Sequence, residues 1–121
     1  MKIDQKRGCT KKQKARQVYT KCGTVEGIRL RSEKGPIDAF LGIPYAKPPT
    51  GELRFKKPEP AVPWIGVLKC KRYRSRAPQN DFFWDRLDLR VGKNEDCLYL
   101  NVIAPGWTTP PELVINCFFF L

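Results

Sequence analysis

Proline and glycine interrupt this chain so densely that a long helix is excluded from most of it. All eleven prolines and most of the nine glycines lie between residues 23 and 111. Proline removes a backbone donor and clashes with the preceding helical turn, and glycine favours turns. A self-sufficient α/β domain should alternate strands with amphipathic helices, but no run of helical period here exceeds a turn or two. The pattern predicts extended segments joined by turns, and a piece of a larger fold.

The first such segments read as a hairpin. Residues 23–31 contain an alternation of apolar and polar side chains from Ile28 onward, which indicates one half-buried strand. Residues 33–35 supply turn chemistry, and residues 36–41 are predicted to return as the paired strand.

Three further segments follow. Residues 42–51 hold three prolines between two glycines, so an irregular loop is expected there. Residues 98–103 are rich in β-formers and are predicted to form a strand. Residues 113–121 begin like another strand and are apolar, but they are far shorter than the roughly 20 residues needed to span a bilayer, so no membrane span is expected.

Two motifs in a fixed order are the most specific signal. Gly42-Ile43-Pro44-Tyr45-Ala46 is followed about 50 residues later by Glu95-Asp96-Cys97-Leu98-Tyr99-Leu100-Asn101-Val102. With these motifs the sequence resembles the N-terminal part of the type-B carboxylesterases, the serine esterases that include the cholinesterases. The resemblance covers about residues 18–115. It implies the α/β class and the N-terminal portion of an α/β-hydrolase fold, truncated, with a small antiparallel N-terminal sheet and the first strands of the central sheet.

The resemblance also divides the chain. Residues 18–121 are expected to form a partial carboxylesterase domain, and residues 1–17 a disordered basic arm. Residues 1–21 carry eight basic side chains and one acidic one, and the whole chain has a net charge of +11. So few apolar residues cannot offset the entropy of ordering the arm. Nonspecific polyanion binding follows from the charge, whereas a specific nucleic-acid site is not expected because Tyr19 is the only aromatic residue nearby.

The N-terminal sequence bears on compartment. No apolar run of the length found in secretory signals occurs before Val18. A cytoplasmic location is therefore expected.

No catalytic residue can be assigned. Acyl transfer by serine needs a nucleophile, a general base and oxyanion donors, and the usual base is histidine. The chain has no histidine, and neither of its two serines, Ser32 and Ser75, lies in a Gly-x-Ser-x-Gly elbow. The five cysteines are scattered without a Cys-x-x-Cys pair, so no metal and no cofactor is expected.

The resemblance does assign three structural residues. Arg54 and Glu95 are similar to the pair that forms a buried salt bridge in these enzymes, and removing one partner of such a pair costs about 3–5 kcal/mol. Cys97 is similar to a cysteine that forms a disulfide in secreted relatives, but Ala77 stands where its partner is implied. Cys97 is therefore expected to be reduced and buried.

Residues 70–94 contain an aromatic cluster and a basic cluster, and each has both a functional and a structural interpretation. Residues 81–87 are expected to form a single helical turn, in which Phe82, Phe83 and Trp84 are interpreted as core-facing anchors and not as a choline-binding wall. Residues 71–76 are basic and either bind phosphate or form a solvated loop, with the solvated loop favoured.

Three functions stay open. The favoured one is an N-terminal fragment of a carboxylic ester hydrolase that is inactive by itself, its full-length parent acting on a small-molecule carboxylic ester. The alternatives are a non-enzymatic cholinesterase-like interaction module and a basic anion-binding protein.

Overall fold

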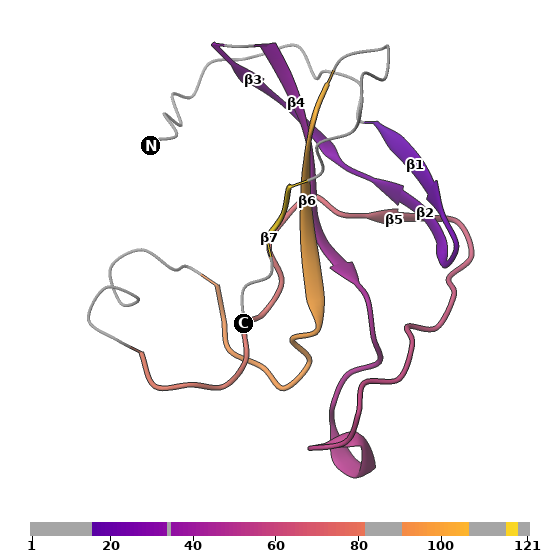
Figure 1. Ribbon diagram of the computed structural model, residues 1–121, viewed down its shortest axis with the longest axis vertical. Coiled ribbons are helices and arrows are strands. Elements are labelled where there is room, and N and C mark those ends of the chain that lie inside the picture. The colour runs from indigo at the N-terminus through magenta and orange to yellow at the C-terminus, as the bar shows by residue number, and fades with distance from the viewer. Residues whose placement is uncertain (1–15, 34, 82–90, 107–115, 119–121) are drawn as a thin grey trace.

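Two small β-sheets make up nearly all of the regular structure (Figure 1). The computed structural model describes residues 16–33, 35–81, 91–106 and 116–118. The first sheet has the strand order β1-β2-β5, with β1 (Gln17–Thr20), β2 (Gly23–Glu26) and β5 (Val67–Lys69). The second has the order β3-β4-β6-β7, with β3 (Ile28–Ser32), β4 (Gly35–Pro44), β6 (Tyr99–Pro105) and β7 (Asn116–Phe118). Within the described residues the only helix is one 3-10 turn, η1 (Gly51–Leu53), and none is long and apolar enough to cross a membrane.

The predicted hairpin is confirmed. Strands β3 and β4 pair antiparallel, and their last cross-strand pair is Ser32 with Gly35. Only two residues separate these positions, the commonest hairpin length, and the positive φ of 120° at Gly35 suits glycine.

The single strand predicted over residues 23–31 is wrong. The strand is interrupted at Gly27, so that β2 pairs within the first sheet and β3 pairs within the second. The Gly27 amide donates to the Arg16 carbonyl oxygen at 3.0 Å, one step beyond the last β1–β2 pair, Gln17 with Glu26. A Cβ atom on Gly27 would stand 2.6 Å from the Ala39 carbonyl oxygen, so only glycine permits this close passage.

The loop predicted over residues 42–51 begins later than expected. Strand β4 continues through Gly42 and Ile43 to Pro44, with a bulge between Leu41 and Ile43 where the register against β6 shifts. Gly42 has a φ of 76°, and its amide donates to the side-chain oxygen of buried Asn101 at 2.9 Å. A bulge absorbs the extra residue and lets the strand end at a proline.

The core lies where the two sheets meet. Val25, Phe40 and Cys70 are buried together, with Ile43, Trp64, Leu68 and Val102 packed against them. Cys70 joins the sheets through its backbone, because its amide donates to the Glu26 carbonyl oxygen and its carbonyl oxygen accepts from the Leu41 amide. The strand predicted over residues 98–103 is confirmed as β6, which runs beside β4 through the middle of the molecule (Figure 1).

Several predictions fall outside the described residues. They concern the arm up to residue 15, the aromatic residues Phe82, Phe83 and Trp84 with their helical turn, and the start of the strand predicted from residue 113. The described part of that last segment pairs antiparallel with β6 as β7.

Candidate functional site

The two serines occupy positions that offer no esterase chemistry. Ser32 ends β3 at the hairpin, and Ser75 lies half-buried in the irregular segment after β5. Neither has an imidazole to take its proton, since the sequence contains no histidine. Among the described residues there is also no group of three side chains able to hold a metal ion.

A hollow of roughly 350 Å³ opens at the surface beside η1. Three separate parts of the chain line it: Pro49, Arg54, Phe55, Pro78, Glu95 and Cys97. All three residues that the sequence assigned a structural role therefore lie around one depression.

The Arg54 and Glu95 side chains meet across this hollow. The guanidinium Nη2 of Arg54 lies 3.2 Å from Oε1 of Glu95. The expectation of a buried bridge is not met here, because the two side chains are 59 % and 40 % exposed. Water screens such a pair, so its contribution to stability falls from several kcal/mol to about 0–1 kcal/mol.

Phe55 borders the hollow in an unusual conformation. Its φ is 59°, the only positive value at a non-glycine residue in the described part of the chain, and the residue is 95 % exposed. The Arg54 guanidinium stands over its ring at 5.2 Å from the centroid, a cation–π distance. A bulky residue in the left-handed region is a genuine outlier and stores backbone strain.

Cys97 is a free thiol, as the sequence predicts, but it is half-buried instead of buried. Burial raises its pKa, and the negative charges of Asp96 and Glu95 raise it further. A protonated thiol is a poor nucleophile, and so Cys97 is unsuited to covalent catalysis near neutral pH. Of the three described cysteines, Cys70 is the fully buried one, and its pKa is likewise raised by burial.

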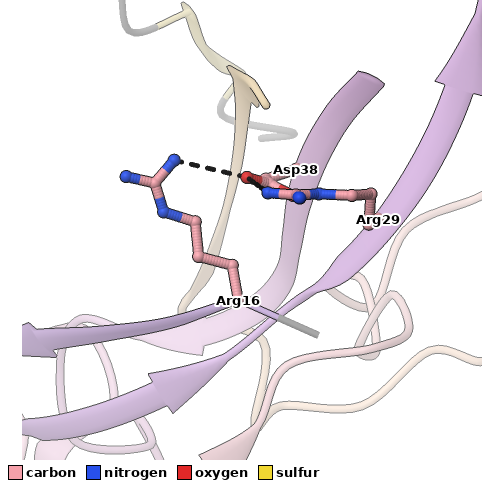
Figure 2. Close-up of polar contacts among 3 residues, drawn as sticks. All are labelled: Arg16, Arg29 and Asp38. Atoms are coloured by element: carbon pink, nitrogen blue, oxygen red, sulfur yellow. Dashed lines mark hydrogen bonds and ion pairs between the residues drawn. The ribbon is translucent and has the colours of Figure 1, made fainter. Parts of the chain in front are cut away.

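A bidentate ion pair with a fully buried carboxylate joins β3 and β4 (Figure 2). Asp38 is fully buried and accepts hydrogen bonds from Arg29 Nε at 2.7 Å and Arg29 Nη2 at 2.8 Å. Arg16, the first described residue, donates a third hydrogen bond from Nη1 to the Asp38 carboxylate at 3.3 Å. Its side chain approaches from the side opposite Arg29 (Figure 2). The Arg29 guanidinium holds the pKa of Asp38 below its usual range, against the opposing effect of burial. This cluster is structural, and sequence analysis missed it because it assigned Arg29 to the polar, solvent-facing side of its strand.

A second ion cluster joins Arg76, Asp81 and Lys93. Asp81 accepts from Arg76 and also lies 2.9 Å from the Lys93 ammonium group. Lys93 and Arg76 together lower the pKa of Asp81. Backbone hydrogen bonds from Arg76 to Gly92 and from Asn94 to Arg76 run alongside. These contacts tie the residues around Arg76 to those around Lys93, and they include no nucleophile that could act on a substrate.

Comparison with known proteins places these features in a family. A family model described as the carboxylesterase family matches residues 14–116. The chain belongs to the carboxylesterase family. Both motifs, the hollow and the three structural residues of this member lie within the matched range.

Three curated relatives resemble the chain. Carboxylesterase 5A of Mus musculus is 42 % identical over 72 % of this chain and 17 % of the relative. A medium-chain fatty acyl-CoA hydrolase precursor of Anas platyrhynchos is 37 % identical over 83 % of this chain and 20 % of the relative. Acetylcholinesterase of Bungarus fasciatus is 38 % identical over 74 % and 16 % respectively. The chain thus spans no more than a fifth of the length of these carboxylesterase-family relatives.

Proposed function

We propose that this chain is the N-terminal part of a carboxylic ester hydrolase and that it has no esterase activity by itself. It would supply the N-terminal sheet and the first strands of the central sheet of an α/β-hydrolase fold, and the complete enzyme would act on small-molecule carboxylic esters. The family match over residues 14–116 supports the class of reaction, since the relatives include a carboxylesterase and an acyl-CoA hydrolase.

The proposed lack of esterase activity rests on the absence of histidine from the sequence. Without an imidazole, a serine hydroxyl keeps its proton near neutral pH and attacks an ester only slowly. The cysteine at the hollow does not replace it, because burial and two neighbouring carboxylates keep the Cys97 thiol protonated. Lysine side chains can still be acylated once by an activated ester, but they do not turn over.

The test is hydrolysis of 4-nitrophenyl acetate by the purified chain. We expect no saturable turnover above buffer, and no covalent labelling by an organophosphate. The matched control is a Ser32→Ala/Ser75→Ala double variant, which should release nitrophenol at the same low rate as the unaltered chain. Saturable hydrolysis that an organophosphate blocks, and that the double variant lacks, would show that the proposal of inactivity is wrong.

We also propose a reducing, cytoplasmic location. The three described cysteines are free thiols, and Ala77 removes the implied partner of Cys97. Thiol trapping tests this: in cells lysed directly into denaturant with iodoacetamide, the cysteines should be alkylated without prior reduction, and a disulfide at Cys97 would contradict it.

A further inference from the structure

Both serines of the chain follow the same arrangement of arginines. Ser32 ends the sequence Arg29-Leu30-Arg31-Ser32, and Ser75 ends the sequence Arg72-Tyr73-Arg74-Ser75. In each case one arginine stands three positions before the serine and a second stands directly before it. Protein kinases select substrates by charge patterns of this kind, because carboxylates in the substrate groove bind the arginine side chains. The sequence alone therefore offers two equivalent candidate sites for phosphorylation.

The structure makes Ser32 a poor site. It is the last residue of β3 and pairs with Gly35 of β4, so its backbone belongs to the hairpin ladder. The arginine three positions before it, Arg29, donates two hydrogen bonds of 2.7 and 2.8 Å to fully buried Asp38. A kinase could bind that guanidinium only after taking it from Asp38, which would leave a buried charge without its main partner. The folded hairpin therefore withholds this serine from a kinase.

Ser75 lies in a segment with neither restraint. Isolated β-bridges fix the chain on either side of it, at Lys71 and at Arg76. Between these two positions, residues 72–75 have no regular secondary structure and form no backbone hydrogen bonds with other described residues. An irregular surface segment of this kind can lie in the groove of an enzyme without the loss of ladder hydrogen bonds.

The side chains that a kinase would bind are exposed. Arg72 and Arg74 both face solvent, and neither forms an ion pair with a carboxylate of the described residues. Arg74 stands over the Tyr99 ring at 5.7 Å from its centroid, a weaker contact than the bidentate pair that a carboxylate offers. Ser75 is half-buried, and its hydroxyl has no hydrogen-bond partner among the described residues. The segment therefore gives up little when it binds a kinase.

We propose that Ser75 is a phosphorylation site for a protein kinase that binds arginine side chains of its substrate. Oγ of Ser75 forms a bond to the γ-phosphorus of ATP, the bond from that phosphorus to the bridging oxygen of the β-phosphate breaks, and ADP leaves. The hydroxyl proton passes to the catalytic aspartate of the kinase, so the chain needs no base of its own. The product carries about two negative charges at pH 7 directly after Arg74, and guanidinium groups are good partners for phosphate. The site is independent of the proposed ester hydrolase.

The test is phosphorylation of the full chain by the catalytic subunit of cyclic-AMP-dependent protein kinase, with Mg²⁺ and ATP. Peptide mapping by mass spectrometry gives the initial rate at each serine. We expect Ser75 to react at least about tenfold faster than Ser32, because the hairpin must open before Ser32 can react. An unmodified Ser75, or a Ser32 that reacts as fast in the folded chain, would overturn the proposal.

Synthetic peptides separate the effect of the fold from that of the local sequence. Peptides of residues 27–37 and 70–80 carry the same arginine pattern before their serines, but neither holds the hairpin ladder or the rest of the sheet. Their rates should differ far less than the rates of the two serines in the folded chain. A difference in the peptides as large as that in the chain would overturn the role assigned to the hairpin.

Two charge variants test recognition through arginine. Arg72→Gln should lower kcat/KM at Ser75 by at least about tenfold, because it removes one charge-assisted contact with the kinase. Lys57→Gln is the matched control, since it removes the same charge from an exposed side chain in another segment, and it should react like the unaltered chain. Unchanged kcat/KM for Arg72→Gln, or an equal loss for Lys57→Gln, would contradict recognition of this segment. Hydrolysis of an ester by the chain would overturn the proposed inactivity and leave the assignment of Ser75 to these phosphorylation rates.

Discussion

Asp38 accepts hydrogen bonds from Nε and Nη2 of Arg29 directly across the β3–β4 hairpin, with its carboxylate fully buried. A bidentate arginine satisfies both carboxylate oxygens at once and fixes their geometry. Because the two residues are cross-strand neighbours, the pair also holds the register of the hairpin that carries the central strand of the second sheet.

Removing Arg29 should open this hairpin. In Arg29→Leu the buried Asp38 charge loses its main partner, and the free energy of opening of β3 and β4 should fall by about 3–5 kcal/mol. Native-state hydrogen exchange of the strand amides measures it. The matched control is Arg16→Leu: the Arg16 side chain is 46 % exposed and contributes one contact of 3.3 Å, so we expect a loss of at most about 1 kcal/mol. Equal losses in the two variants would contradict the dominance of Arg29.

The same pair predicts the acid response of the hairpin. The folded chain lowers the pKa of Asp38, chiefly through Arg29, so the unfolded state binds the additional proton and stability rises with pH. The contribution is complete above the unfolded pKa of about 3.9 and disappears as pH falls through the folded value. An NMR titration of the Asp38 carboxyl carbon should give a midpoint below that of an unfolded reference peptide.

Asp38→Asn is the control for the acid response. It should flatten the pH dependence of the β3–β4 amide signals below about pH 4 without abolishing it in the rest of the chain, because the pKa of Asp81 is lowered as well. A midpoint for Asp38 at or above that of the reference peptide would rule out the assigned role of Arg29.

Parts of this fold follow from local sequence and parts do not. The hairpin could be predicted, but its turn was placed over residues 33–35. In the structure Gly35 pairs with Ser32, and this register puts Arg29 opposite Asp38. What misled the sequence analysis was polarity: period-two alternation assigns charged residues to water, whereas here a buried carboxylate is neutralised by its neighbour. Local rules evaluate side chains one at a time and cannot show that two charges meet.

The predicted strand boundaries were also wrong at two glycines, where the backbone departs from regular strand geometry. The break at Gly27 and the bulge at Gly42 depend on what lies against each residue, the Ala39 carbonyl oxygen in one case and the Arg74 side chain in the other. Those neighbours come from distant parts of the chain, so the sequence near each glycine does not reveal them. The pairing of Arg54 with Glu95 was expected only from the family resemblance, and neither the hollow nor the strained Phe55 beside it was anticipated.

Gly42 should tolerate substitution less well than Gly51 and Gly92, which have open space where a Cβ atom would stand. A Cβ atom there would stand 2.4 Å from Arg74 Cγ and 3.0 Å from the Arg72 carbonyl oxygen, in addition to its φ of 76°. Gly42→Ala should therefore destabilise the second sheet by more than the roughly 1–2 kcal/mol that left-handed strain alone costs. Gly51→Ala, with a φ of 54° but open space, should show the strain alone, and Gly92→Ala, with open space and no positive φ, should be nearly neutral. Limited proteolysis rates of the three variants give the order, and a Gly42 variant as stable as the Gly92 variant would contradict the bulge.

The cysteines should react with alkylating agents in a fixed order. Cys70 is almost completely buried, and its raised pKa keeps it protonated, so iodoacetamide should modify it only after unfolding. Half-buried Cys97 should react in the folded chain, but slowly, and Glu95→Gln should speed it by removing one of the charges that raise its pKa. Peptide mapping by mass spectrometry at pH 8, with and without urea, measures these rates. Fast alkylation of Cys70 in the folded chain would show that the core at the junction of the two sheets is open.

Arg54 should matter little to the stability of the chain, despite the buried pair that the family resemblance implies. Its contact with Glu95 is 3.2 Å, but both partners are more than a third exposed, so solvent screens the attraction and competes for each charge. Arg54→Leu should lower the free energy of opening by less than about 1 kcal/mol, well below the effect of Arg29→Leu, although both variants remove one arginine from one carboxylate. Hydrogen exchange of the β4 and β6 amides in the two variants provides the comparison. A loss of about 3 kcal/mol or more for Arg54→Leu would mean that the pair is desolvated, contrary to its exposure.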